Sequence, residues 1–325
     1  MNVTFVNTKI DSVMLNGSQG GNSATLNIDA ASKVGVVILE AKTTSVISGD
    51  ATGIESILIP GVSEQEANQI VANEAKAALA AGGNVTLVGT IDMGGETVAI
   101  PNGTTISGGT IENAHLTAAD ENSVSFNGVT FGDTTTVEAK GDGSLSFVDC
   151  EFNVTPAMYN GFSRGAAIIG ANQYYTLDLY LEGCTFNYTA GSIDTWNAAI
   201  FMWSNVDSCV IKNCTFNGYG FMAVKLMNVA EGAEIVFEGN TFNMSKQGDA
   251  NYYNNNAVQI MPQHDNPLTV KFINNTFTGD YKDGTMVARI EVMHGGTLSN
   301  LTFEQSGNTI NGAAVTYANF AIKAN

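Results

Sequence analysis

The sequence predicts an all-β fold in which the chain winds into a parallel β-helix, a solenoid of stacked strands. Three observations lead to this prediction: a hexapeptide that recurs seven times, a column of turn-forming residues within it, and a second short apolar strand between successive copies. We expect a small β-domain at residues 1–62, a capping helix at residues 63–83 and the β-helix at residues 84–325.

The hexapeptide begins with a large apolar residue and ends with phenylalanine in all seven copies, the last of which is Leu298–Phe303. Its third position holds only Gly, Asn or Asp, the residue types that tolerate a positive φ. Because side chains alternate along a straight strand, apolar positions one, four and six face one interior only if the chain turns a corner at position three. The copies end, 21 to 35 residues apart, at Phe131, Phe152, Phe186, Phe216, Phe242, Phe277 and Phe303.

A second strand recurs between the hexapeptides, as in Ala199–Met202 and Ala223–Leu226. Two or three short strands in every 21 to 35 residues are typical of a solenoid whose coils stack about 4.8 Å apart. The alternative is a β-sandwich in which the seven aligned copies are a coincidence. In the solenoid we expect inward pairs at Ile200/Met202, Val224/Leu226, Val258/Ile260 and Ile290/Val292, with Ala199, Ala223 and Ala257 facing outward.

With these repeats, the chain resembles the right-handed pectin-lyase-like β-helix superfamily over residues 84–325, and the right-handed winding is what this resemblance implies. Upstream, Ser63-Glu-Gln-Glu66 is a capping box that opens a helix, and Gly82-Gly83 ends it. This helix resembles the N-terminal cap of the superfamily, and Ile100–Gly109 resembles the entry to phage tailspike and fibre β-helices. Residues 1–62 lack the repeat, although Val34–Leu39 and Ile57–Ile59 predict strands there.

The composition predicts a folded chain and excludes two classes of partner. With 44% hydrophobic and 14% charged residues, the chain differs from disordered proteins, which pair low hydrophobicity with high charge. Its 13 Lys and Arg against 31 Asp and Glu give a net charge of −18, so we expect no binding to nucleic acid or to anionic membrane surfaces. No stretch approaches 18 apolar residues, which excludes membrane insertion.

Three cysteines share one inward column of the repeat, and two asparagines continue it. The Cβ atoms of a disulfide lie about 3.8 Å apart, whereas equivalent side chains on successive coils stay about 4.8 Å apart. We therefore expect reduced, buried thiols, and no metal site because no histidine shares the column. The column is Cys150, Cys184, Cys214, Asn240 and Asn275.

An apolar stripe is predicted beyond the second strand of each coil, at Trp203, Met227, Met261 and Met293. An open apolar stripe on a surface normally marks an interface, and for a rod the natural assembly is a homotrimer about its long axis. The alternative is that loops of the same chain cover the stripe.

The loops that follow each closing phenylalanine carry aromatic rings and carboxylates. Flat rings stack on sugar faces, and carboxylates bond sugar hydroxyls, so these loops predict carbohydrate binding. The alternative is that the loops are simply polar and that tyrosines fill their interiors. The predicted binding residues are Tyr188, Asp194, Trp196, Tyr252, Tyr253 and Tyr281.

No catalytic residue is predicted with assurance, and we expect no cofactor. The Asn-Thr-Asp, Asp-Asp and Gly-His-Gly motifs of polygalacturonase-like enzymes are absent. The resemblance implies that a lyase on this scaffold would use Ca²⁺ held by Asp residues and a basic Arg. The nearest constellation is Arg289 and Glu291 on one face, with His294 just beyond and His264 and Asp265 one coil earlier. The alternative is an ordinary surface ion pair beside a loop histidine.

These patterns favour a non-enzymatic virion- or cell-surface protein of the phage fibre, tailspike or head-decoration type, which binds glycans or a host surface. Residues 1–62 would then contact a capsid or tail protein. One alternative is a polysaccharide lyase or glycoside hydrolase on the same scaffold, and another is a secreted bacterial adhesin. The start, Met1–Phe5, shows no basic or apolar leader, so we expect no signal peptide or one already removed, and a location on a virion or outside the cell.

Overall fold

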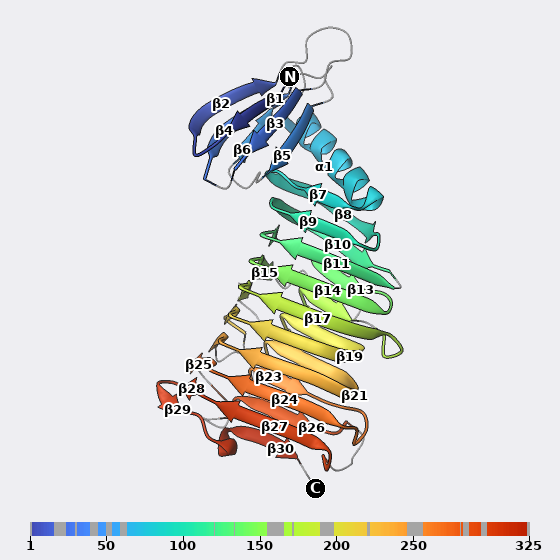
Figure 1. Ribbon diagram of the computed structural model, residues 1–325, viewed down its shortest axis with the longest axis vertical. Coiled ribbons are helices and arrows are strands. Elements are labelled where there is room, and N and C mark those ends of the chain that lie inside the picture. Colours follow the sequence, from blue (N-terminus) through green and yellow to red (C-terminus); the bar gives the residue numbers. More distant parts are fainter. Residues whose placement is uncertain are drawn as a thin grey trace.

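The computed structural model confirms an all-β fold, with 61% of the described residues in strands and 8% in helix. The molecule is elongated, with its N-terminal strands at one end and its C-terminus at the other (Figure 1). The structure describes residues 2–15, 24–29, 31–39, 45–49, 54–58, 64–119, 121–132, 134–154, 166–170, 172–188, 198–219, 222–245, 256–279, 281, 286–293 and 298–323.

The N-terminal segment forms two three-stranded parallel sheets around a small core of its own. The first sheet contains β1 (Asn2–Phe5), β3 (Ala24–Ile28) and β5 (Ser45–Gly49), and the second contains β2 (Lys9–Leu15), β4 (Lys33–Leu39) and β6 (Ile54–Leu58). The two predicted strands fall in β4 and β6. Because consecutive strands alternate between the sheets, this segment also stacks in layers although its sequence lacks the hexapeptide. Its core is Leu15, Leu26, Ile28, Val34, Val37 and Ile54, joined by Val88 from the connection between residues 84–86 and 90–100 of the large sheet.

The helix α1 (Glu64–Ala81) confirms the predicted capping helix, although its first expected residue, Ser63, lies outside the described residues. The helix ends where Gly82 and Gly83 adopt φ of 75° and 83°, which residues with a Cβ rarely adopt. Its apolar side chains Ala72, Ala75 and Leu79 belong to the main core. The helix therefore lies between the N-terminal sheets and the large sheet (Figure 1).

The remaining strands form a single sheet of 24 strands within the described residues, in which equivalent strands of successive layers pair in parallel. The chain passes repeatedly through the same set of strand positions, and we call each pass a layer. The strands of one layer pair with the equivalent strands of the next layer. Three stacks of strands run through the layers. The first stack contains β7 (Asn84–Thr86), β9 (Thr104–Ser107), β11 (Asn122–Asn127), β14 (Gly143–Val148), β17 (Thr176–Glu182), β24 (Leu268–Ile273) and β27 (Leu301–Ser306).

Within each layer, the strand of the second stack comes directly after the corner, and the strand of the third stack comes after that. The second contains β12 (Thr130–Phe131), β15 (Glu151–Val154), β18 (Thr185–Tyr188), β20 (Thr215–Asn217), β22 (Thr241–Met244), β25 (Thr276–Gly279) and β28 (Thr309–Ile310). The third contains β13 (Thr136–Ala139), β16 (Ile168–Gly170), β23 (Val258–Ile260), β26 (Ala288–Glu291) and β30 (Phe320–Lys323).

Four long strands bend from one stack into another, and a short hairpin closes the C-terminal end. The long strands are β8 (Thr90–Ile100), β10 (Thr110–Ala118), β19 (Ile200–Lys212) and β21 (Val224–Glu238). The hairpin pairs β28 with β29 (Ala313–Ala314) in antiparallel fashion, and a 3₁₀ turn at Tyr317–Asn319 precedes β30.

The predicted corner at position three of the hexapeptide is confirmed in six copies. Glycines and non-glycine residues share the same left-handed conformation there, with φ of 60° at Gly128, 52° at Asp149 and 53° at Asn213. The turn directs position one and position six into one core, where Phe126, Phe147 and other rings are fully buried.

The seventh predicted copy is wrong. Leu301–Phe303 pairs with Leu268–Val270, and the corner of that layer is Gly307, with φ of 66°. The true copy is Gln305–Ile310, which pairs with Phe272–Phe277. Phe320 packs against Phe272 with ring centroids 5.1 Å apart and so occupies the space that Gln305 leaves in the core.

All four predicted inward pairs face the main core, but the fourth is displaced in register. Val258 pairs with Ala288 and Ile260 with Ile290, so Val292 packs against the core one inward position further along. The alanines predicted to face outward are buried in the main core. The chain bends at Ala199, and the backbone N–H groups of Ala199 and Ile200 both donate to the Ala223 carbonyl, so the bend turns both side chains inward.

The cysteine column is confirmed as reduced and buried. All four cysteines are free thiols, and Asn308 extends the column beyond Asn240 and Asn275. The asparagine side chains form hydrogen bonds with buried backbone N–H and carbonyl groups that water does not reach. Asn240 Nδ2 donates to the Ile211 carbonyl at 2.8 Å, and Asn240 Oδ1 accepts from the Cys214 backbone N–H at 2.9 Å.

We expect all four thiols to resist thiol reagents in the native protein and to react once it unfolds. Burial raises the pKa of Cys209 to about 12 from 9.0, so the folded protein keeps this thiol neutral at pH values where the unfolded chain ionises it. The stabilisation from this thiol is complete below about pH 9 and is lost as the pH rises towards 12. Titration with a chromogenic disulfide reagent at pH 8, with and without guanidinium chloride, checks the prediction. Rapid reaction of a thiol in the native protein would contradict it.

Candidate functional site

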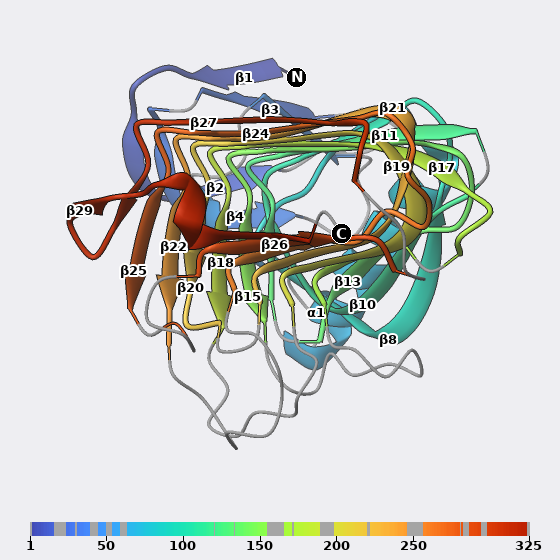
Figure 2. The same cartoon turned by 90° about the horizontal axis from the view of Figure 1, so that it is seen from below.

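The second stack presents an outward surface of threonine and asparagine, which we call the Thr–Asn face. Its phenylalanines point inward, so the side chains on either side of them point outward, and none of these side chains is buried. Figure 2 shows the strands β15, β18, β20, β22 and β25 side by side. The threonine row, in register order, is Thr90, Thr110, Thr130, Glu151, Thr185, Thr215, Thr241, Thr276 and Thr309.

A second row runs beside the first, two residues later in each strand, and it is linked along part of its length by hydrogen bonds. Asn217 Nδ2 donates to Asn187 Oδ1 at 2.9 Å, and Asn243 Nδ2 donates to Asn217 Oδ1 at 2.7 Å. These bonds fix the orientation of each amide. The row consists of Asp92, Glu112, Gly132, Asn153, Asn187, Asn217, Asn243 and Thr278, and the side-chain hydrogen bonds run from Asn153 to Thr278.

The threonine hydroxyls are available for an external partner. Within the described residues, the hydroxyls of Thr185, Thr215 and Thr241 make no hydrogen bond to a protein group, whereas Thr278 bonds Asn243 at 2.5 Å. Asn217 and Asn243 each keep a second amide N–H and a second lone pair, whereas Asn187 Nδ2 donates to both Glu151 Oε1 and Asn153 Oδ1. The face thus offers fixed donors and acceptors that repeat about every 4.8 Å along the molecule.

This face was visible in the sequence, because position five of the hexapeptide is threonine in six of the seven copies quoted above. Sequence reasoning missed it because position five of the hexapeptide contributes nothing to the core, and the predictions were drawn from the inward positions. The pairing register turns that column into a continuous surface row.

The predicted pair Arg289 and Glu291 forms a half-buried ion pair. Arg289 donates to a Glu291 carboxylate oxygen at 2.5 Å, and the side chains are 18% and 13% exposed. Gln259 Nε2 donates to the other carboxylate oxygen at 3.3 Å, and Arg289 Nε is buried with no hydrogen-bond partner among the described residues. Arg289 shares its outward column with Phe201 and Lys225, which are 2% and 5% exposed.

The other members of the predicted catalytic constellation do not join this pair in the described residues. His264 is exposed on the connection between β23 and β24. Asp265 accepts hydrogen bonds from the Ser299 hydroxyl and from the Asn300 backbone N–H. Its carboxylate therefore stabilises the turn before β27 in the next layer. His294 lies outside the described residues.

The predicted apolar stripe is half-buried. Trp203, Met227 and Met261 occupy one outward row, but Glu291 takes the fourth place because Ile260 pairs with Ile290, which leaves Met293 two residues further on. Part of the chain crosses this row: Gln173 Oε1 accepts bonds of 3.4 Å from both Trp203 Nε1 and Gln263 Nε2. This contact favours the alternative in which the chain covers its own stripe. Self-association at the stripe stays a prediction.

Two of the predicted sugar-binding residues lie in the interior. Tyr188 and Tyr281 are 8% and 6% exposed and belong to the main core, so neither ring presents a face to a sugar. Burial raises the pKa of the Tyr281 phenol. The remaining residues of that prediction, Asp194, Trp196, Tyr252 and Tyr253, lie outside the described residues, and their role stays a prediction.

A charged cluster that the sequence did not reveal lies on β10 and β13. His115 Nε2 is 2.6 Å from Glu138 Oε2, Lys140 Nζ is 3.6 Å from the same oxygen, and Thr97 Oγ1 is 3.4 Å from His115 Nδ1. Residues this far apart in sequence meet only because Thr97 pairs with His115 and Thr117 with Glu138. In the part of the chain that the structure describes, no group of three or more His, Cys, Asp or Glu side chains could hold a metal ion.

Comparison with protein-family models found no match, and comparisons with curated proteins and with solved structures found none either. Among the described residues, no helix is both long and apolar enough to span a bilayer. The functional argument therefore depends on the geometry of the molecule.

Proposed function

We propose that the protein is a right-handed parallel β-helix that binds surface glycans without cleaving them, as a virion- or cell-surface protein of the phage fibre, tailspike or head-decoration type. The glycan lies along the Thr–Asn face. The observation that carries this proposal is the row of threonine hydroxyls that no described protein group bonds, beside a row of oriented asparagine amides.

A repeating surface suits a repeating ligand. Hydroxyls and amides both donate and accept, as sugar hydroxyls do. Three consecutive layers therefore offer the same pair of contacts to successive sugars, at Thr185/Asn187, Thr215/Asn217 and Thr241/Asn243. A single hydrogen bond of this kind contributes only about 0.5–1.5 kcal/mol. Contacts repeated along a rigid face share one cost of lost translational and rotational freedom, so each further sugar adds only the cost of ordering its own linkage. The net charge of −18 favours glycans without acidic groups.

The same proposal assigns the remaining surfaces. Residues 1–62 contact a capsid or tail protein, and the rods associate as homotrimers on the virion or outside the cell. A secreted adhesin would use the Thr–Asn face in the same way. A polysaccharide lyase or hydrolase would instead depend on Arg289 and Glu291, and it would release new chain ends.

We expect the double variant Thr215→Val/Thr241→Val to bind its glycan about fivefold to a hundredfold more weakly than the unmodified protein. Valine keeps the shape and strand preference of threonine and removes only the hydroxyl, so two lost hydrogen bonds correspond to about 1–3 kcal/mol. The measurement is binding to a panel of immobilised bacterial surface polysaccharides, after size-exclusion chromatography with light scattering to establish the oligomer.

The matched control is Thr269→Val/Thr302→Val, which removes two parallel-paired outward hydroxyls from the first stack. We expect this control to bind as the unmodified protein does. Equal affinity of the two double variants would refute binding on the Thr–Asn face. New reducing or unsaturated ends in the incubated polysaccharide would refute the non-enzymatic function.

A further inference from the structure

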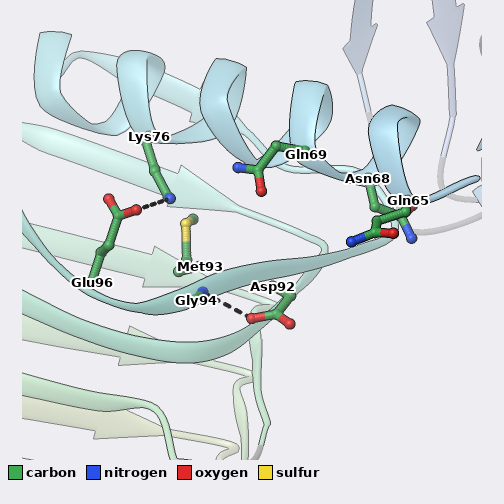
Figure 3. Close-up of a pocket in the computed structure, with 8 residues that line it drawn as sticks. All are labelled: Gln65, Asn68, Gln69, Lys76, Asp92, Met93, Gly94 and Glu96. Atoms are coloured by element: carbon green, nitrogen blue, oxygen red, sulfur yellow. Dashed lines mark hydrogen bonds and ion pairs between the residues drawn. The ribbon is translucent and has the colours of Figure 1, made fainter. Parts of the chain in front are cut away.

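A cavity of about 450 Å³ lies between the helix α1 and the strand β8 (Figure 3). This volume falls in the range of small-molecule sites. Side chains from the helix form one wall and residues of β8 form the other. The lining residues are Gln65, Asn68, Gln69 and Lys76 from the helix, and Asp92, Met93, Gly94 and Glu96 from the strand.

The cavity lies at the end of the Thr–Asn face. Thr90 pairs with Thr110 and Asp92 with Glu112, so Asp92 is the first member of the second row as well as a lining residue of the cavity. The next place in that row is Gly132, where a Cβ would lie 2.7 Å from Glu112 Cγ. The glycine therefore leaves room for the Glu112 side chain to lie along the row. A chain-like ligand on the face leads directly to the cavity.

The polar groups of the cavity divide into those held in place and those left for a ligand. Asp92 Oδ1 accepts bonds from Asn113 Nδ2 at 3.0 Å and from the Gly94 N–H at 2.8 Å, which lower the pKa of Asp92 and keep it ionised. Lys76 Nζ pairs with Glu96 Oε1 at 2.8 Å (Figure 3). In the described residues, no protein group bonds the side-chain amides of Gln65 and Asn68, whose sticks lie across the cavity from Asp92 (Figure 3).

The lining defines the chemistry of the ligand. Two carboxylates and one ammonium leave a net negative charge, which disfavours phosphates and uronic acids. Carboxylate and amide oxygens accept hydroxyl protons, and amide nitrogens donate to hydroxyl oxygens. Met93 lies behind this polar lining, fully buried in the main core, so its methyl group reports on the cavity without contacting the ligand. This combination fits a sugar ring with neighbouring hydroxyls and no acidic substituent.

We propose that this cavity receives the terminal sugar of the glycan that lies on the Thr–Asn face, and that this sugar is a neutral or amino sugar. The proposal rests on the proposed function, because it treats the cavity as the closed end of that binding face. It adds recognition of a chain end to binding along the chain.

The test follows the Met93 methyl signal in NMR spectra of protein labelled at its methionine methyl groups, with the signal assigned through Met93→Leu. We expect glucose, galactose, mannose or glucosamine to shift this signal in a saturable manner, and glucuronic acid to leave it unchanged. The variant Gln65→Ala/Asn68→Ala should weaken the sugar binding at least tenfold. Its matched control is Glu74→Ala on an exposed position of the same helix that does not line the cavity, which should bind as before. Alanine favours the helix in both variants.

The outcomes separate this inference from the proposed function. If Thr215→Val/Thr241→Val loses the polysaccharide but keeps the Met93 shift, both proposals stand. If the polysaccharide binds but none of the four sugars shifts the Met93 signal, the terminal-sugar site is wrong and the face stands. If sugars shift the signal but no polysaccharide binds, the link between cavity and face is wrong. Equal weakening by the two helix variants also overturns the site.

Discussion

Replacing Asn275 with alanine is expected to lower the free energy of unfolding by about 3–5 kcal/mol. Asn275 is fully buried, and its amide makes bonds to two neighbouring layers. Its Oδ1 accepts from the backbone N–H and the Nδ2 of Asn240, both at 3.0 Å, and its Nδ2 donates to the Phe237 carbonyl at 2.8 Å. Alanine would leave these groups buried without partners and would open a cavity. Urea titration followed by circular dichroism measures the loss.

Two further variants separate the buried hydrogen bonds from general effects of removing an asparagine. Asn243→Ala removes a half-buried amide of the Thr–Asn face, where water replaces the lost partners, and should cost less than about 1 kcal/mol. Asn275→Cys should fall between the two, because Cys184 and Cys214 occupy the same column and Cys184 Sγ contacts the Phe147 carbonyl at 3.4 Å. Equal losses for Asn275→Ala and Asn243→Ala would show that the inner column does not stabilise the stack.

Sequence columns predicted those parts of the fold that one residue type dictates. The corners at Gly128 and Asn213 need residues that tolerate positive φ, and few other types do, so the corners are visible as a column. Register at the C-terminal end was harder to predict. Leu298–Phe303 has the apolar residues of the hexapeptide, whereas the true copy Gln305–Ile310 lacks both the initial apolar residue and the final phenylalanine. The core space that Gln305 leaves is filled by Phe320, which comes later in the chain, so no local sequence pattern reveals the packing.

The candidate site also has one part that a sequence repeat predicts and another that depends on how distant segments pack. The threonine row depends on a local repeat and could have been found from position five of the hexapeptide. The cavity joins Gln65 on the helix to Asp92 on β8, and only the packing of α1 against that strand brings them together. The burial of Tyr281 and the partial burial of Arg289 were equally beyond the sequence, because burial depends on what the fold places around these residues.

Replacing Phe216 with alanine is expected to lower the free energy of unfolding by about 3–5 kcal/mol. Phe216 is fully buried and lies in the middle of a column of closing phenylalanines. Its ring stacks on Phe186 with centroids 4.8 Å apart and on Phe242 with centroids 4.9 Å apart. Truncation removes both stacked contacts and leaves a cavity that cannot collapse, because the backbone spacing of the layers is fixed by their parallel hydrogen bonds.

The control for this prediction is Phe216→Leu, which keeps an apolar side chain in the column and should cost less than half as much. Layers in a stacked fold contact mainly their neighbours, so the damage at Phe216 should concentrate near β18, β20 and β22. Hydrogen exchange measured by mass spectrometry should therefore rise first in those strands and least in β10, several layers away. Uniformly faster exchange along the whole sheet would instead mean that the stack unfolds as one cooperative unit, and the stability of each layer would then depend on every ring in the column.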